Sequence, residues 1–156
     1  MTGTMGTTGT FYLHPPAKPP NLINPVILAY VGDAVFELFV RQYLVSLPNH
    51  KSDHLHRSAT RFVSARAQRE LLERWMPLLS EEESDIVRRG RNAKSGAPPK
   101  NADHRDYRQA TALECLVGYL YYTGRLDRLN VLLGVAFGQG ADRPALPERK
   151  EDEGID

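Results

Sequence analysis

The sequence contains a single cysteine, Cys115, so the chain cannot form an internal disulfide bond. This absence fits a reducing compartment, and we expect the protein in the cytoplasm. Cys115 lies in an apolar run with no histidine near it in the sequence. We therefore interpret it as a small core residue rather than as a thiol nucleophile.

Long uncharged apolar runs and an excess of one charge are also missing. No apolar run could span a bilayer without including a charge, so no membrane partner is expected. The N-terminal residues have no early Lys or Arg and no apolar core, which argues against a secretory signal. The net charge is only +1, so any attraction to nucleic acid has to come from local clusters of basic residues.

The 156 residues, 41% of them hydrophobic, suit one globular domain. Residues 1–20 are rich in Thr and Gly and end in prolines, which predicts a flexible N-terminal arm. Residues 138–156 are polar and interrupted by Pro and Gly, which predicts a disordered tail. The folded domain is expected to cover residues 21–137.

Within that domain the spacing of apolar residues predicts helices and no convincing strand, and hence an all-α fold. Asn24 and Pro25 form a good helix start, Ser80 with Glu83 forms a capping box, and Gly124 is placed to end a helix. The expected helices cover residues 26–45, 52–75 with a bend, 81 to about 89, about 106–122, and 126–133.

Isolated carboxylates stand out in two of these helices. Asp33 and Glu37 are the only charged residues over 26–40, and Glu114 is the only one over 109–124. Both helices are apolar on nearly every side, so we expect both to be central and to lie next to each other.

A buried, unpaired carboxylate is costly, and two of them repel each other. A hard divalent cation such as Mg²⁺, which prefers oxygen ligands, would relieve that repulsion between Asp33 and Glu114. The alternative is that each carboxylate pairs with an arginine or caps a neighbouring helix. The pattern alone leaves both alternatives open.

A basic, glycine- and proline-containing loop is expected over residues 90–104, and cations dominate from 88 to 108. Charge combined with short polar donors suits contacts to phosphates and to the 2′-hydroxyls of an RNA duplex. A solvated loop that is basic by chance is the alternative. The candidate RNA-binding residues are Arg88, Arg89, Arg91, Asn92, Lys94, Ser95, Lys100, Asn101, His104, Tyr107 and Arg108.

Three blocks of the sequence together resemble the Mini-III ribonuclease family, the small members of the ribonuclease III superfamily. The resemblance covers about residues 21–135. Gly32-Asp33-Ala34 matches the Gly-Asp-Ala/Ser element of the superfamily, and Glu114 matches its second acid-bearing helix. The blocks are NPVILAYVGDAVFELFVR, LHRSATRFVSARAQ and RRGRNAKSGAPPKNADHRDYRQATALECLVGYLYYTG.

The chain departs from full-length ribonuclease III where the larger enzymes carry further acids. It has Val26 and Ala29 before the Gly-Asp element, Ala65 after Val-Ser, and Thr111 before the second glutamate. Mini-III proteins share this reduced set. The number of metal ions per site therefore stays open.

The resemblance implies a homodimeric, ribonuclease III-like helical endonuclease without a separate double-stranded RNA-binding domain. Asp33 and Glu114 would be both the metal ligands and the catalytic residues, with Mg²⁺ as cofactor and Mn²⁺ as a substitute. Glu37, one turn from Asp33, would support the metal ligands without binding the metal itself, or lie at the dimer interface. Alternatively, it would form a structural ion pair.

The substrate class that the resemblance implies is double-stranded RNA, notably precursor large-subunit (23S) ribosomal RNA. Hydrolysis would leave 5′-phosphate and 3′-hydroxyl ends, and a ribosomal protein or pre-ribosomal particle would be a further partner. Two rival functions remain at this point. One is a catalytically inactive RNA-binding scaffold, and the other is a helical hydrolase of a small phosphate compound.

Overall fold

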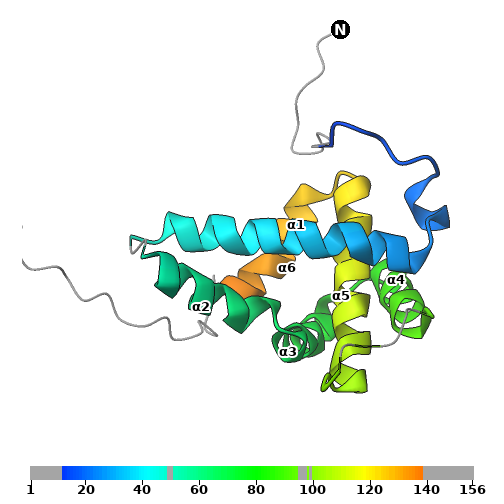
Figure 1. The fold of residues 1–156 in the computed structure, drawn as a ribbon. Helices are drawn as coiled ribbons and strands as arrows, with labels where there is room; N and C mark the ends of the chain where they lie inside the picture. The colour runs from blue at the N-terminus through cyan, green and yellow to red at the C-terminus, as the bar shows by residue number, and fades with distance from the viewer. Residues whose placement is uncertain (1–11, 49–50, 95–97, 99, 139–156) are drawn as a thin grey trace, which may run out of the picture.

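The computed structural model describes residues 12–48, 51–94, 98 and 100–138, and within them the chain is helical without a strand (Figure 1). The prediction of an all-α fold is confirmed. The elements are the 3-10 turn η1 (Pro20–Leu22), α1 (Pro25–Ser46), α2 (Ser52–Val63), α3 (Ala65–Trp75), the 3-10 turn η2 (Met76–Leu78), α4 (Glu81–Asn92), α5 (His104–Tyr122) and α6 (Leu126–Phe137).

The predicted helix ends form as their side-chain chemistry requires. The Asn24 side chain accepts a hydrogen bond from the Val26 amide at 2.9 Å. Ser80 and Glu83 form the reciprocal capping box, each side chain bonding the other's backbone amide. Gly124, with a φ of 72°, follows the end of α5 in the left-handed conformation that glycine adopts without strain.

Two boundaries differ from the prediction because polar side chains cap helices there. Ser64 leaves the helical conformation and accepts a hydrogen bond from the Ala67 amide at 3.2 Å, which separates α2 from α3. Asp103 accepts from the amides of Arg105 and Asp106, so α5 begins at His104 rather than near Asp106. Since α4 also continues to Asn92, the connecting loop is shorter than the predicted 90–104.

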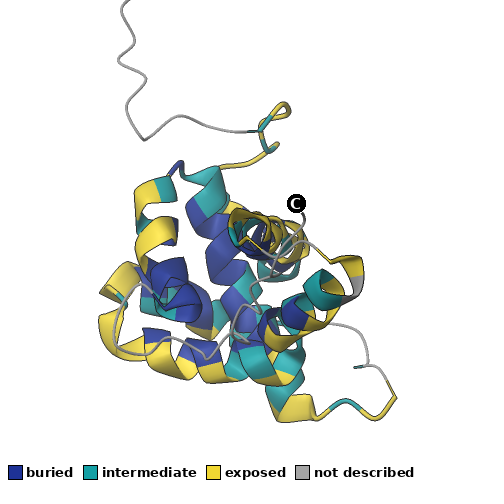
Figure 2. Ribbon diagram, turned by 90° about the vertical axis from the view of Figure 1, so that its left-hand side faces the viewer, coloured by how far each residue is buried: buried dark blue, intermediate teal, exposed yellow. Residues whose placement is uncertain are grey.

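Helix α5 is the centre of the domain, as its apolar sequence predicts. Leu113, Leu116, Val117 and Leu120 are fully buried, and α1, α3 and α4 pack around the helix (Figures 1 and 2). Cys115 is buried here too, and its thiol donates to the Ile86 carbonyl at 3.8 Å. Its exposure of 1% confirms a core cysteine, and this burial raises the pKa of the thiol to about 12.

Helix α1, in contrast, is not surrounded on all sides, so the prediction of a fully central helix is wrong. Ile27, Tyr30, Leu38 and Val45 are 53%, 79%, 52% and 58% exposed. Their spacing places them on one stripe of the helix, which we call the α1 stripe. An apolar sequence on every side does not distinguish a core helix from one with a face at the surface of the single chain.

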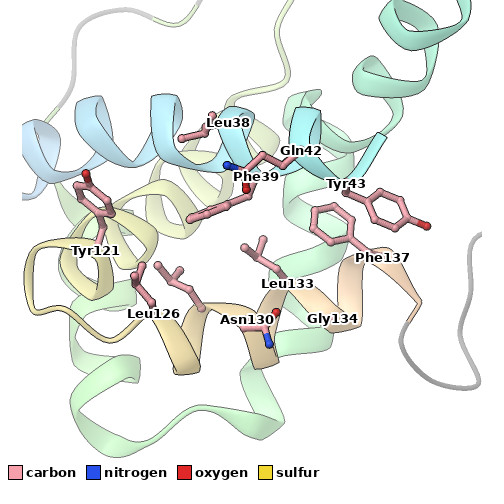
Figure 3. A pocket seen from close by; sticks show the side chains of 11 residues that line it. Leu38, Phe39, Gln42, Tyr43, Tyr121, Leu126, Asn130, Leu133, Gly134 and Phe137 are labelled. Atoms are coloured by element: carbon pink, nitrogen blue, oxygen red, sulfur yellow. The ribbon is translucent and has the colours of Figure 1, made fainter. Parts of the chain in front are cut away.

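Between α1 and α6 lies an apolar groove of about 510 Å³ (Figure 3). Tyr43 and Phe137 stack at one end, with ring centroids 4.4 Å apart, and Tyr121 lies at the other. None of the residues that line the groove carries a charge, so it offers no acid, base or metal ligand.

The predicted arm and tail fall mostly outside the described residues, which omit 1–11 and 139–156. Near the end of the predicted arm, the Tyr12 ring packs edge-on against Tyr121 and Tyr122, at centroid distances of 6.1 and 5.4 Å. The division into arm, domain and tail stays a prediction. No helix in the described part of the chain combines the length and apolarity needed to cross a membrane.

Candidate metal centre

Two glycines let α1 and α5 cross in direct backbone contact. A Cβ atom on Gly32 would lie 1.7 Å from the Glu114 carbonyl oxygen, and one on Gly118 would lie 2.1 Å from the Leu28 carbonyl oxygen. No side chain fits at either position without pushing the helices apart. The crossing therefore brings Asp33, the residue after Gly32, into electrostatic contact with Glu114.

Asp33 lies at the exposed side of this crossing. The expectation of a buried carboxylate is wrong for Asp33, because α1 turns this side chain toward the uncovered edge of the helix. Partial desolvation and the nearby Glu37 carboxylate still raise the pKa of Asp33.

Glu114 lies deeper, on the half-buried side of the same crossing. Burial, followed by the negative charge of Asp33, raises the pKa of Glu114 to about 8. A hydrogen bond from the Gln68 side chain acts in the opposite direction and favours the carboxylate. Metal-free, this pair therefore resists carrying two negative charges at once.

No cation of the protein relieves that repulsion within the described ranges. Neither Asp33 nor Glu114 forms an ion pair with Lys, Arg or His there, and neither caps a helix. Among the described residues, therefore, neither an arginine partner nor a helix cap explains the two carboxylates. Two carboxylates without a counter-charge are the oxygen donors that a hard divalent cation prefers.

The donor set is small. The described residues contain no group of three or more Asp, Glu, His or Cys side chains that could hold a metal ion. Mg²⁺ is commonly held by one or two carboxylates and completes its six ligands with water and phosphate oxygens. Two protein carboxylates that leave room for a phosphate therefore fit this ion.

The four positions without the acids of the larger enzymes add no oxygen ligand. Ala29 is buried, Val26 is half-buried, and Ala65 is the first residue of α3. The Thr111 hydroxyl donates to the Tyr107 carbonyl of its own helix at 3.0 Å.

Glu37, one turn beyond Asp33, forms an ion pair with Arg41 at 2.7 Å. Of the predicted alternatives for Glu37, the local ion pair is present. Between α1 and α2, a groove of about 480 Å³ begins at Glu37 and Arg41 and is lined further along by Ser52, His56 and Thr60. A groove with one polar side and an apolar floor that includes Leu44 and Leu55 thus opens one turn from the candidate centre.

Sequence reasoning missed Gln68. Gln68 lies on α3 and is only 2% exposed, and its side chain forms a hydrogen bond with Glu114. A glutamine in a helix with several charged residues looks like a surface residue, so no signal in one sequence identifies it. Arg69, next to it, is tied to Asp106 and Glu73, so α3 is fixed against the start of α5.

The predicted RNA-binding residues lie along the end of α4 and the start of α5. Arg88 pairs with Asp85, Arg89 donates to the Asn21 carbonyl, and Arg91 donates to Gln109. Asn92 ends α4 and His104 begins α5. Tyr107 is half-buried, and Ser95 lies outside the described residues. The exposed members are Arg88, Asn92, Lys94, Lys100, Asn101, His104 and Arg108.

The basic residues lie at different distances from the carboxylate pair. His104 precedes Glu114 by ten residues of α5, which is about 15 Å at the rise of an α-helix. Gly90, between Arg89 and Arg91, packs against Ala112 and Cys115, so these two arginines lie beside the part of α5 that carries Glu114. The structure thus brings Asp33, Glu114 and Gln68 together, with the candidate RNA-binding residues spread from this part of α5 to its start, which suits an extended ligand better than a small phosphate compound.

Comparisons with known proteins agree with this geometry. A family model described as Ribonuclease III domain matches residues 27–125. A Mini-ribonuclease 3 of Brevibacillus brevis is 49% identical over 120 residues, covering 77% of this chain and 90% of that protein. A Mini-ribonuclease 3 of Staphylococcus aureus is 44% identical over 114 residues, covering 72% and 85%.

A solved structure shows the same fold. The crystal structure of protein FN1578 from Fusobacterium nucleatum matches with a TM-score of 0.72 over 78% of this chain and 99% of that chain. At 24% identity, this likeness supports the fold alone.

Proposed function

Because the chain belongs to the ribonuclease III domain family, within its Mini-ribonuclease 3 group, and is an endoribonuclease of that type, we propose that Asp33 and Glu114 hold the divalent cation with which it hydrolyses double-stranded RNA. The observation that carries this proposal is the meeting of two carboxylates that no cation of the described chain neutralises. An inactive scaffold would not need two uncompensated carboxylates. A hydrolase of a small phosphate compound does not fit the ribonuclease III family.

Each side chain of the centre has a definite task in this proposal. Asp33, at the exposed side, faces the substrate, and Glu114 holds the cation from the half-buried side. A bound Mg²⁺ supplies the activated water and stabilises charge on the phosphate oxygens, and Mn²⁺ can replace it. No histidine is then required as a general base.

The substrate is held by its backbone in this proposal. Arg108 and His104 precede Glu114 by six and ten residues of α5, about 9 and 15 Å along the helix, within reach of phosphates along the same duplex. Without a separate RNA-binding domain in the described chain, we expect modest affinity with a steep dependence on salt.

The test is an incubation of the purified protein with long double-stranded RNA, with Mg²⁺ or with a chelator. We expect shortening of the RNA only with metal, and products with 5′-phosphate and 3′-hydroxyl ends. Equal cleavage in the chelator would contradict the metal centre. Cleavage of single-stranded RNA alone would contradict the substrate class.

We further propose that the α1 stripe is covered by a second copy of the chain. Tyr30 is 79% exposed and precedes Asp33 by one turn, so a partner on this stripe would place two centres close together. Tyr30→Glu should shift the sedimentation profile from dimer to monomer, with Arg74→Gln, on another helix, as control. A wild-type protein that sediments as a monomer at micromolar concentration would contradict this interface.

For the natural substrate, we propose a double-stranded stalk of precursor 23S ribosomal RNA, processed alone or with a ribosomal protein or pre-ribosomal particle. The resemblance to Mini-III ribonucleases supports this choice. Cleavage of a precursor transcript at one position in its stalk is the expected result. Cleavage at many unrelated positions would contradict it.

A further inference from the structure

Gln68 is one of three polar or charged residues that the described domain buries almost completely; the other two are Ser58 and Glu83. Glu83 has its partners in the capping box and in Arg128, and the Ser58 hydroxyl faces His54 at 3.5 Å. Both therefore have structural explanations. The side-chain amide of Gln68, at 2% exposure, is directed at Glu114.

The direction of that hydrogen bond follows from the chemistry of the two groups. In the ionised form that binds a cation, the Glu114 carboxylate only accepts hydrogen bonds, so Gln68 presents its NH₂ group to it. A buried amide without such a partner would be costly, and so would a buried carboxylate without a donor. The two groups therefore satisfy each other.

The position of Gln68 is fixed by the packing of α3. Ser64 caps the helix one turn before it, and Leu71, Leu72 and Trp75 are buried after it. The Trp75 ring nitrogen donates to the Leu132 carbonyl at 2.9 Å. The amide of Gln68 is thus held by the core and can hold the Glu114 side chain in one orientation.

The neutrality of the amide decides what this contact can do. An arginine at this position would pair with Glu114 and compete with a divalent cation for its charge. A leucine would give the carboxylate no donor. A glutamine bonds one oxygen of the ionised carboxylate without neutralising its charge, and leaves the second oxygen available beside Asp33.

We propose that Gln68 is a positioning residue that orients the Glu114 carboxylate toward the cation shared with Asp33. This inference rests on the proposed metal centre. Partners behind metal ligands typically change metal affinity by 10–100-fold when they are removed. Gln68 contacts neither RNA nor metal in this arrangement and acts only through Glu114.

The test compares Gln68→Met, which keeps the length of the side chain and removes the donor, with the wild-type protein. Mn²⁺ affinity is measured without RNA from the signal of free Mn²⁺ in electron paramagnetic resonance. Cleavage is measured in parallel as a function of Mg²⁺ concentration. Gln68→Leu serves as a second variant if Gln68→Met does not fold, as judged by circular dichroism.

We expect Gln68→Met to bind Mn²⁺ 10–100-fold more weakly and to recover much of its activity at high Mg²⁺. Binding of double-stranded RNA in a chelator should be unchanged. The control is Ser58→Ala, which also removes a buried polar group but should change only the melting temperature.

The outcomes separate the two proposals. Wild-type Mn²⁺ affinity in Gln68→Met, with affinity lost in Glu114→Gln, would overturn the role of Gln68 and leave the metal centre standing. Wild-type affinity in both variants would overturn both proposals. The same loss of affinity in Ser58→Ala as in Gln68→Met would overturn the positioning role, because any buried polar group would then serve.

Discussion

Two pairs of acidic residues around α5 differ in whether basic side chains neutralise their charge. At the start of α4, Arg125 donates to both oxygens of Glu82 at 3.0 Å, and Arg128 donates to both oxygens of Glu83 at 2.8 Å. At the crossing of α1 with α5, no arginine or lysine of the described residues pairs with Asp33 or Glu114.

The pKa values follow this difference. Hydrogen bonds from Arg125 and Tyr119 lower the pKa of Glu82. Burial alone would raise the pKa of Glu83, but Arg128 and the Ser80 amide hold it below its ordinary value. At the crossing, the pKa values of both Asp33 and Glu114 are raised.

The contrast separates acids that stabilise the fold from acids that are available to a ligand. Glu82 and Glu83 hold α4 to α6 and to the end of α5, with their charge already compensated. The charge of Asp33 and Glu114 is uncompensated, which destabilises the metal-free protein and favours a cation. Four experiments test this difference between the two pairs.

The largest expected effect is on cleavage. Asp33→Asn and Glu114→Gln should each reduce the rate by roughly a thousand-fold or more, since several kcal/mol of transition-state stabilisation depend on the metal. Folding and RNA binding should be retained. Glu82→Gln is the matched control, and a loss of activity there as large as at Asp33 would remove the distinction between the two pairs.

The next effect is on the compensated pair. Glu83→Gln should lower the free energy of unfolding by about 2–3 kcal/mol, because it leaves Arg128 partly buried without its counter-charge. Urea denaturation measures this value, with Glu81→Gln, an exposed residue of the same turn, as control. Equal stability of the two variants would show that burial does not matter at Glu83.

A smaller effect of opposite sign is expected at Glu114 without metal. Its folded-state pKa of about 8 lies above the ordinary value of 4.5, so its contribution to stability is full below pH 4.5 and is lost as the pH rises to about 8. Glu114→Gln should therefore stabilise the metal-free protein at pH 8 by at least about 1.4 kcal/mol, the equivalent of one pKa unit.

Thermal unfolding in a chelator at pH 5 and pH 8 measures that difference. The melting curves of the wild type and of Glu114→Gln should nearly coincide at pH 5. At pH 8 the variant should melt at the higher temperature. A variant that is less stable than the wild type at pH 8 would mean that Glu114 has a compensating partner.

The smallest effect concerns the basic residues at the end of α4 and in the loop that follows it. Replacing Arg91 and Lys94 together by glutamine should flatten the salt dependence of RNA binding by a slope of about 2, one unit for each lost phosphate contact. Binding by filter retention over a range of salt concentrations measures this slope. Arg74→Gln, whose guanidinium bonds the Val135 carbonyl, is the control and should leave the slope unaltered.

Local patterns in the sequence predict much of the fold. Asn24, Ser80 with Glu83, and Gly124 mark helix ends because their chemistry acts on the neighbouring backbone. Asp103 and Ser64 act in the same way, and their omission explains the two misplaced boundaries. The candidate pair can also be predicted from the sequence, since Asp33 and Glu114 are isolated charges in apolar helices.

The helices, their caps and the two unusual carboxylates could therefore be predicted, because they depend on spacing along one chain. The packing of the helices was needed to show that Gly32 and Gly118 bring the carboxylates together, that Asp33 is exposed, and that Gln68 bonds Glu114. Those facts depend on the contact between α1, α3 and α5. The free energy of a carboxylate depends on such neighbours in space, which spacing along one chain does not specify.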